Sequence, residues 1–192
     1  MSEKKKKGKI VIICAPSGTG KSTLIKKLLI RFPQLVESVS TTTRPKREGE
    51  VEGVDYFFIS ESDFLRDKEK LVEWAKVHDN YYGTGKKFIE DNLKQGKFIL
   101  CDVDVQGCDN FKKLYPEDSK VIFLSPPSLE ILENRLRNRG TETEKSLKTR
   151  MANAKIEMKR KDDFDFNVVN DDLEPAFKEL EGIFESILKG NS

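Results

Sequence analysis

The chain has 192 residues, which is enough to bury a substantial core in one or two compact units. Charged residues make up 35% of the chain and hydrophobic residues 36%. No apolar run approaches the roughly 20 residues that a membrane-spanning helix needs. The composition therefore predicts a soluble protein and argues against an integral membrane protein.

The net charge of +2 hides an uneven distribution. Residues 1–9 carry five lysines and one glutamate, which leaves 30 basic and 32 acidic residues, a net charge of −2, in the rest of the chain. We expect residues 1–8 to be a disordered basic tail, and the remainder to offer no nucleic-acid-binding surface. There is no apolar signal-peptide region, and we interpret Cys14, Cys101 and Cys108 as reduced thiols. Both features predict a cytoplasmic protein.

A strand, a glycine-bearing loop and a helix follow directly after this tail. Ile10–Cys14 is apolar and predicts a short buried strand. Apolar residues then recur at intervals of three and four from Leu24 to Phe32, which predicts a helix that Pro33 ends. The loop between them ends in Gly-Lys-Ser, as a phosphate-binding loop does in this context. The predicted nucleotide-binding residues are Ala15, Pro16, Ser17, Gly18, Thr19, Gly20, Lys21, Ser22 and Thr23.

The chemistry of this loop favours a nucleoside triphosphate. Its backbone N–H groups and the helix N-terminus point at one spot, where an anion is favoured. Lys21 can reach the terminal phosphates, and the Ser22 hydroxyl can ligate Mg²⁺. Ala15 stands where such loops usually begin with glycine, and a methyl group is tolerable there if φ stays negative. The alternative, an ordinary glycine-rich turn, rarely ends in Gly-Lys-Ser.

The rest of the pattern predicts a β-rich insert followed by further strands and helices. In the insert we expect strands at Val54–Ile59 and Leu71–Ala75, a short helix capped by Ser62, and a turn at Asn80–Thr84. The later elements are a helix that closes at Gly96, strands at Lys97–Val105, Val121–Leu124 and Phe166–Val169, a helix that ends before Pro116, and helices at Leu129–Arg139, at Glu144–Lys159 and from about Asp172.

This order of elements predicts an α/β fold. We expect a three-layer core of the P-loop type, with a parallel sheet and helices on both faces, at residues 9–37 and 95–192. A β-rich subdomain is expected to be inserted at residues 38–94, and the charged helical pair near 129–158 to form a lid.

The insert holds the densest group of polar residues in the chain. Arg44 and Arg47 flank a proline, and two guanidinium groups on a stiffened loop suit bidentate capture of a phosphate. Tyr56 and Tyr82 can add phenolic O–H donors. Glu73 stands in an apolar strand, where a carboxylate is costly unless it is paired. Each residue alone is more often structural than functional, but their clustering after a phosphate-binding loop favours a second phosphate site.

A series of short motifs runs through the chain, namely Ser40–Arg47 with Gly49-Glu50, Asp55-Tyr56, Glu73-Trp74, Asn80–Thr84, Asp102–Asp104 with Gln106-Gly107, Arg139–Thr141 and Val169–Asp171. In this order, from about Lys9 to Leu188, they resemble guanylate kinase, a nucleoside monophosphate kinase family of P-loop proteins. Bacterial members of that family often carry Ala-Pro-Ser-Gly in the loop, as at Ala15–Gly18.

The resemblance implies an enzyme that transfers the γ-phosphoryl group of ATP to GMP, giving ADP and GDP, with Mg²⁺ as cofactor. A carboxylate such as Glu73 can accept hydrogen bonds from the guanine N1–H and amine together, and adenine has no N1–H to offer. By resemblance, the residues that hold the GMP phosphate are Arg44, Arg47, Tyr56 and Tyr82, and those that read the guanine edge are Ser40, Glu73, Thr84 and Asp104.

Further residues are predicted at the reacting phosphates. Asp102 ends an apolar run in the manner of the acidic residue that orients Mg²⁺, and Ser22 is its expected companion. Arg135 and Arg139 lie four residues apart on one helix face and are predicted to bind ATP, and Arg150 lies on the following helix. The predicted catalytic residues are Lys21, Arg44, Arg139 and Arg150.

The predicted partners are ATP and GMP, with dGMP left open as an acceptor, and neither nucleic acid nor a membrane is expected. A monomer and a weak homodimer both stay open. Three alternatives remain: a kinase for AMP or UMP, a non-catalytic guanylate-kinase-like module that binds protein ligands, and a nucleic-acid binder acting through the lysine tail. We assign no catalytic role to His78 and expect Trp74 in the core.

Overall fold

The computed structural model describes residues 8–77, 79–138 and 143–190. The predicted lid residue Arg139 and the polar-turn residue His78 lie outside these ranges. The chain divides into two compact units. The first comprises the described residues up to Ile10, Leu35–Cys101 and Gln106–Ser119, and the second comprises Val11–Gln34, Asp102–Val105 and the described residues from Lys120 onward.

A five-stranded parallel sheet with flanking helices forms the α/β core, which confirms the predicted fold class. Strand β1 is central, and its residues Ile10 to Cys14 are fully buried, as expected for a strand covered on both faces. The strands in spatial order are β2 (Leu35–Glu37), β7 (Phe98–Asp102), β1 (Lys9–Cys14), β8 (Ser119–Ser125) and β9 (Phe166–Val169).

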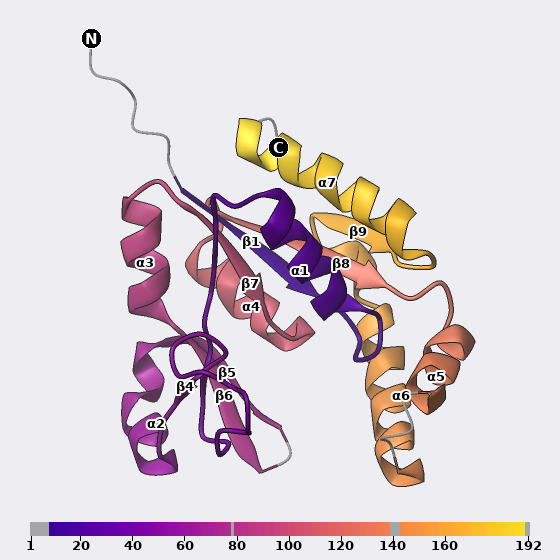
Figure 1. The fold of residues 1–192 in the computed structure, drawn as a ribbon, viewed down its shortest axis with the longest axis horizontal. Coiled ribbons are helices and arrows are strands. Elements are labelled where there is room, and N and C mark those ends of the chain that lie inside the picture. Colours follow the sequence, from indigo (N-terminus) through magenta and orange to yellow (C-terminus); the bar gives the residue numbers. More distant parts are fainter. Residues whose placement is uncertain (1–7, 78, 139–142, 191–192) are drawn as a thin grey trace. The chain divides into compact units, whose positions relative to one another are not determined.

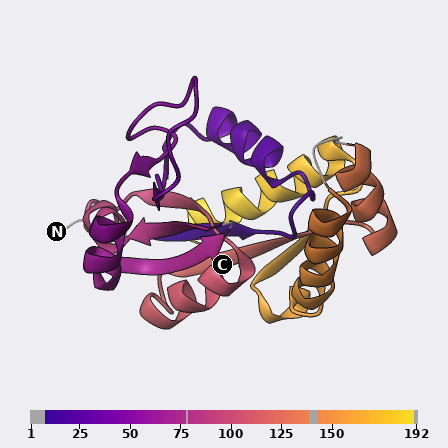
Figure 2. The ribbon, with the colours of Figure 1, turned by 90° about the horizontal axis from the view of Figure 1, so that it is seen from below.

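The helices of the second unit pack in two pairs. Helices α1 (Lys21–Arg31) and α7 (Leu173–Lys189) run side by side (Figures 1 and 2). The rings of Phe32 and Phe184 stack with their centroids 5.8 Å apart. Helices α5 (Leu129–Asn138) and α6 (Glu144–Met158) pack through a buried cluster and are followed by a short 3₁₀ turn, η2 (Lys161–Asp163). The cluster residues are Leu132, Leu136, Leu147 and Ala154.

The first unit contains a separate, mixed four-stranded sheet. Strands β5 (Leu71–Val77) and β6 (Asn80–Gly85) are antiparallel, β6 is antiparallel to β3 (Thr41–Thr42), and β3 is parallel to β4 (Phe57–Phe58). The remaining elements of this part of the chain are α2 (Glu61–Asp67), η1 (Lys68–Lys70), α3 (Lys86–Lys94) and α4 (Val105–Leu114).

The strand predicted at Val54–Ile59 is too long, because β4 comprises only Phe57–Phe58. The preceding residues form a turn, in which the backbone N–H groups of Val54 and Asp55 both donate to the Val51 carbonyl. The Asp55 carboxylate in turn accepts from the Val51 N–H at 2.7 Å. An acidic residue that bonds to its own turn therefore overrides the apolar, aromatic composition that suggested a strand.

The turn predicted at Asn80–Thr84 is wrong, because these residues belong to β6. They pair with β5 on one side and β3 on the other, so long-range hydrogen bonds override their turn-like composition. The strand predicted at Lys97–Val105 is too long: β7 ends at Asp102, and Val105 already begins α4.

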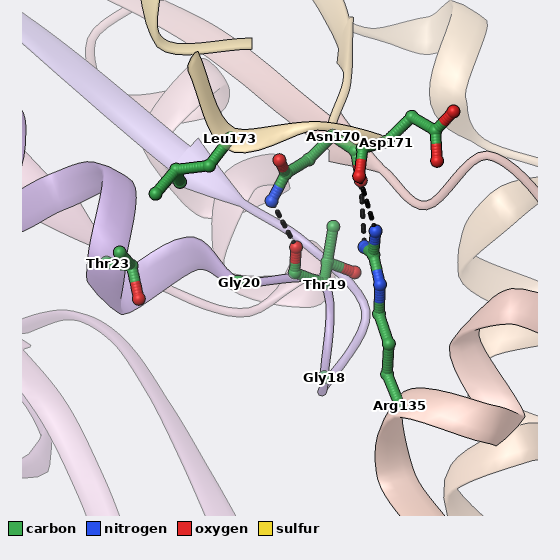
Figure 3. A pocket seen from close by; sticks show the side chains of 8 residues that line it. All are labelled: Gly18, Thr19, Gly20, Thr23, Arg135, Asn170, Asp171 and Leu173. Atoms are coloured by element: carbon green, nitrogen blue, oxygen red, sulfur yellow. Dashed lines mark hydrogen bonds between the residues drawn. The ribbon is translucent and has the colours of Figure 1, made fainter. Parts of the chain in front are cut away.

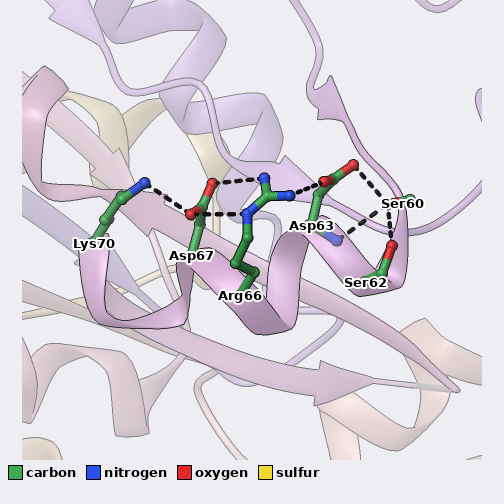
Figure 4. A network of polar contacts seen from close by, with 6 residues as sticks. All are labelled: Ser60, Ser62, Asp63, Arg66, Asp67 and Lys70. Carbon is green, nitrogen blue, oxygen red and sulfur yellow. Dashed lines mark hydrogen bonds and ion pairs between the residues drawn. The ribbon is translucent and has the colours of Figure 1, made fainter.

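The short helix α2 is capped by Ser60 rather than by the predicted Ser62 (Figure 4). The Ser60 hydroxyl accepts from the Asp63 N–H at 3.1 Å, and the helix continues in a ladder of exposed ion pairs that includes Arg66. Trp74 was expected in the core, and this prediction is wrong. The residue is 42% exposed, and Lys68 Nζ lies 3.3 Å from its ring centroid.

Among the residues that the structure describes, no helix has the length and apolar character needed to cross a membrane. The three cysteines are free and buried, as expected for reduced core thiols.

Candidate active site

The loop between β1 and α1 offers backbone N–H groups to a ligand. Gly18 and Gly20 both have a φ of 96°, a left-handed conformation that side chains disfavour. Helix α1 begins without a side-chain cap and without an acidic residue in its first turn, whereas Ser60 and Thr143 cap α2 and α6. Its first N–H groups are therefore left for an anion, at the positive end of the helix dipole. Ala15 keeps a negative φ, as its place in such a loop requires.

Lys21 and Asp102 meet at the carboxyl ends of two parallel strands. Lys21 directly follows the loop after β1, and Asp102 is the last residue of β7. The ammonium group of Lys21 forms an ion pair with the Asp102 carboxylate and donates to the Val103 carbonyl at 3.2 Å. The Asp102 side chain remains 41% exposed, so it can also face a ligand. Ser22 is exposed at the start of α1.

One of the predicted arginines contacts the loop itself, and a second contacts the turn after β9. Arg150, on α6, donates to the Ser17 hydroxyl in the loop. Arg135, on α5, donates to the carbonyls of Asn170 at 2.8 Å and Asp171 at 2.7 Å (Figure 3). The structure thus brings Arg150 to the loop, and it places Arg135 on the neighbouring turn after β9. Arg139, the third predicted arginine, lies outside the described residues.

A pocket of about 240 Å³ lies beside the phosphate-binding loop (Figure 3). Its lining includes three residues that the sequence did not mark as binding residues, namely Asn170, Asp171 and Leu173. The remaining lining residues are Gly18, Thr19, Gly20, Thr23 and Arg135. Asn170 could have been predicted as a binding residue from the sequence, because it follows an apolar strand and ligands bind at the carboxyl ends of the strands in parallel sheets.

The first unit gathers three of the residues predicted to hold the second phosphate. The Arg44 guanidinium lies 5.4 Å from the centre of the Tyr56 ring, and that ring meets the Tyr82 ring edge-on at 5.9 Å. Arg47 is exposed on the same loop, and its backbone N–H donates to Glu50 Oε2 at 2.8 Å. Arg44, Tyr56 and Tyr82 are therefore together, with Arg47 nearby in the chain.

Glu50 holds Arg44 in place, a role that sequence reasoning missed. Its two carboxylate oxygens accept from the Arg44 guanidinium at 2.6 and 3.1 Å, in the bidentate geometry that fixes an arginine best. The hydrogen bond from Arg44 lowers the pKa of Glu50, and the same bond raises the pKa of Arg44. In the sequence, Glu50 is only part of the Gly49-Glu50 motif, because a glutamate in a charged loop gives no local signal that Arg44 is its partner.

The predicted base-reading residues are partly brought together. Glu73 and Thr84 are opposite each other on β5 and β6, 8% and 1% exposed, and the Thr84 hydroxyl donates to the Glu73 carboxylate at 2.7 Å. Ser40 precedes β3, and its carbonyl accepts from the Phe57 N–H at 2.9 Å. Glu73 is thus the buried, paired carboxylate that its apolar strand demanded.

Asp104 belongs to the second unit, unlike the other predicted base readers. It is exposed, and its charge acts on Glu157 of α6. Burial, and next the charge of Asp104, raise the pKa of Glu157, while Lys21 opposes the shift. Glu157 is a further acidic group beside the lysine that the sequence did not single out.

A parallel sheet, a glycine loop that opens into an uncapped helix, and a lysine paired with a strand-end aspartate together define a P-loop nucleotide-binding protein.

Within that class, a family model described as guanylate kinase matches residues 7–187. The chain belongs to the guanylate kinase family, as its motifs suggested.

Individual relatives cover nearly the whole chain. The guanylate kinase of Thermotoga maritima is 44% identical over 182 residues, which cover 94% of this chain and 87% of the relative. The guanylate kinase of Rickettsia felis is 45% identical over 181 residues, covering 93% and 94% respectively. The crystal structure of guanylate kinase from Anaplasma phagocytophilum matches with a TM-score of 0.73 at 32% identity, and the match covers 95% of this chain and 87% of that one.

Proposed function

We propose that the chain is an ATP:GMP phosphotransferase, which transfers the γ-phosphoryl group of ATP to GMP and releases ADP and GDP. The observation that carries the proposal is the buried Glu73–Thr84 pair, in a unit that also holds the arginine and tyrosine cluster. Family membership supports the same activity. The intact Lys21 and Ser22 favour an enzyme over a non-catalytic module that binds proteins.

The donor side of the reaction is assigned to the second unit. The loop residues Ala15 to Thr23 bind the ATP phosphates, with backbone N–H groups of the residues other than proline and the start of α1 as the donors. Lys21 neutralises charge on the terminal phosphates, and Arg150 acts on the same group, an assignment that its hydrogen bond to the Ser17 hydroxyl supports. Arg135 and Arg139 complete the predicted ATP-binding arginines, with Arg139 resting on the sequence alone.

The acceptor side is assigned to the first unit. Arg44, Arg47, Tyr56 and Tyr82 hold the phosphate of GMP, and the contacts of Arg44 with Glu50 and the Tyr56 ring support this by presetting its guanidinium. Ser40, Glu73 and Thr84 of this unit read the guanine edge, and the family resemblance adds Asp104, which belongs to the second unit. An ionised Glu73 accepts from both guanine donors, whereas adenine would leave this buried charge without partners.

The residues near Lys21 fit a Mg²⁺ ion carried in with ATP. The oxygens of the Ser22 hydroxyl and the partly exposed Asp102 carboxylate are donors that Mg²⁺ accepts, directly or through water. In the described ranges, no group of three or more His, Cys, Asp or Glu side chains could hold a metal ion. This fits an ion held mainly by phosphates and water. When bound, the ion supplies charge neutralisation on the phosphates.

The protein's part in the chemistry is positioning and charge neutralisation. The acceptor oxygen of GMP is already anionic, so transfer in line with the leaving ADP needs no general base and no covalent enzyme intermediate. Lys21 and the arginines stabilise the charge that spreads over the transferring group. Exclusion of water protects ATP from hydrolysis, and we assign this to the lid at residues 129–158, where α5 and α6 share one buried cluster.

The remaining assignments follow from the same proposal. Residues 38–94 are the GMP-binding subdomain, residues 9–37 and 95–192 the core, and residues 1–8 a basic tail. The buried free thiols support a cytoplasmic location. A monomer or weak homodimer remains a prediction that sedimentation equilibrium would measure.

A coupled assay of ADP formation tests the proposal with ATP and GMP, AMP, UMP or CMP supplied separately. We expect turnover with GMP to exceed that with each other monophosphate by about 10³-fold or more in kcat/KM. Preferred turnover of AMP or UMP would assign the chain to another monophosphate kinase specificity. Absence of turnover with all four would overturn the proposal.

A further inference from the structure

The amide of Asn170 reaches into the phosphate-binding loop from a different part of the chain. Asn170 follows β9, 151 residues after Thr19, yet its Nδ2 donates to the Thr19 carbonyl at 2.6 Å (Figure 3). Asn170 is 5% exposed and Thr19 is 1% exposed, so this hydrogen bond is shielded from water. A buried carbonyl that lost this donor would be left unsatisfied, which makes the contact energetically significant.

Asn170 is itself fixed by contacts on both of its backbone groups. Its N–H donates to the carbonyl of Ser125, the last residue of β8, at 2.8 Å. Its carbonyl accepts from Arg135 at 2.8 Å. The side-chain amide therefore projects from an anchored backbone and can hold a partner in a set position.

Gly20 makes room for this amide. A Cβ atom at Gly20 would lie 2.6 Å from Asn170 Nδ2, closer than a real Cβ contact comes. The glycine thus serves two needs, its φ of 96° and the close approach of Asn170 to the Thr19 carbonyl.

The orientation of the Thr19 carbonyl determines where the next N–H points. The Thr19 carbonyl and the Gly20 N–H belong to one planar trans peptide unit, so they point in opposite directions. When Asn170 holds the carbonyl, the Gly20 N–H is turned away from Asn170. On the other side, the Thr19 hydroxyl donates to the Pro16 carbonyl at 2.7 Å, which fixes the residue against rotation.

We propose that Asn170 is a positioning residue for the phosphate-binding loop, holding the Thr19–Gly20 peptide so that the Gly20 N–H faces the phosphates of the donor nucleotide. This rests on the proposed function only in that the loop binds a polyphosphate. Asn170 also lines the neighbouring pocket, so a ligand there and the phosphates beside it are organised by one residue.

The test uses inorganic tripolyphosphate as the probe, because it has no base or ribose. Its affinity is measured by calorimetry for the wild-type chain and for Asn170→Ala, which removes the donor without adding charge. Asn92→Ala is the matched control: Asn92 is 8% exposed and its Nδ2 donates to the Phe88 carbonyl at 2.8 Å, but it lies on α3 in the other unit. Asn170→Ala is expected to weaken tripolyphosphate binding about tenfold, and the control and the affinity for GMP to change less than about twofold.

A second measurement follows the loop directly. The amide resonance of Gly20 in ¹⁵N-labelled protein is expected to move in Asn170→Ala and not in Asn92→Ala. If Asn170→Ala does not fold, Asn170→Ser takes its place in both measurements. Unchanged tripolyphosphate affinity in a folded variant would overturn the proposal. This holds even if the affinity for ATP falls, because Asn170 would then act only through contacts with the nucleoside. Neither measurement needs turnover. If the chain proved inactive on GMP, the proposed function would be refuted, but these two measurements would still test the role of Asn170.

Discussion

The two proposed phosphate sites are built from different materials. The donor site uses backbone N–H groups of one continuous segment, at the uncapped start of α1. The acceptor site uses side chains that come from separate segments, with Arg44 in a loop, Tyr56 before β4 and Tyr82 in β6. The first is set largely by local backbone conformation, whereas the second depends on tertiary pairing of strands.

This difference has an energetic consequence. A backbone site costs little further ordering when an anion arrives, because the helix and glycine conformations already fix its donors. A side-chain site must hold long, flexible groups in place, and here Glu50 does so for Arg44 with two hydrogen bonds. We therefore expect the acceptor site to depend on residues that hold its side chains, such as Glu50, whereas the supporting residue of the donor site, Asn170, acts on a single backbone peptide.

The largest effect on turnover is expected from substitution of Lys21, which directly follows the donor loop. Lys21→Met removes the cation that neutralises the transferring phosphates and should lower kcat about 10³-fold. Lys27→Met on the same helix is the control, because Lys27 pairs with Glu174 at 2.5 Å on an exposed face and should leave kcat within about twofold. Steady-state kinetics with GMP as acceptor measures both. Near-normal turnover of the Lys21 variant would remove the lysine from the mechanism.

The same contrast explains how much could be predicted from the sequence. The strand, loop and helix around Lys21 were predicted correctly, because periodicity and glycine positions are local signals. In the acceptor unit, the strand predicted at Val54–Ile59 was too long because a side-chain-supported turn precedes β4, and the turn predicted at Asn80–Thr84 was wrong because these residues pair with other strands. Residue roles there came from a family resemblance. The contacts of Glu50 with Arg44 and of Asn170 with Thr19 could not be predicted, because no local sequence pattern indicates which residues pair.

A smaller but more selective effect is expected from the buried carboxylate of the acceptor unit. Glu73→Gln still accepts from Thr84, so the fold should persist, but it replaces a charged acceptor of the guanine donors with a neutral one. The value of kcat/KM for GMP should fall about 10²-fold while KM for ATP stays within about twofold. Glu69→Gln, exposed in η1, serves as the control. Equal losses for both substrates would mean that Glu73 supports the enzyme as a whole rather than the base site.

Removal of the residue that supports Arg44 should have an effect of intermediate size. Glu50→Gln weakens the bidentate pairing, so KM for GMP should rise about tenfold with little change in KM for ATP. Glu48→Gln, exposed on the same loop, is the control. An unchanged KM for GMP would show that Arg44 needs no support from Glu50.

The same variant gives a pH test with a defined sign. The hydrogen bond from Arg44 lowers the pKa of Glu50 in the folded chain, so its contribution to stability is present above the ordinary carboxyl pKa and is lost as pH falls through the lowered value. The difference in Tm between wild type and Glu50→Gln should therefore be largest near neutral pH and shrink below about pH 4. A difference that grew on acidification would contradict the assigned pairing.

The smallest effect concerns the scaffold beside the acceptor site. Ser60→Ala removes the cap of α2 and should lower the free energy of unfolding by about 1 kcal/mol, whereas Ser62→Ala should change it by less than about 0.5 kcal/mol. Urea unfolding measures both, and a larger loss at Ser62 would restore the cap expected from the sequence. The KM for GMP of the Ser60→Ala variant then shows whether the acceptor site depends on the stability of α2. If KM for GMP stays constant in Ser60→Ala, the contacts of Arg44 within its own loop suffice to organise the acceptor site. If KM for GMP rises, the acceptor site also depends on the packing of α2.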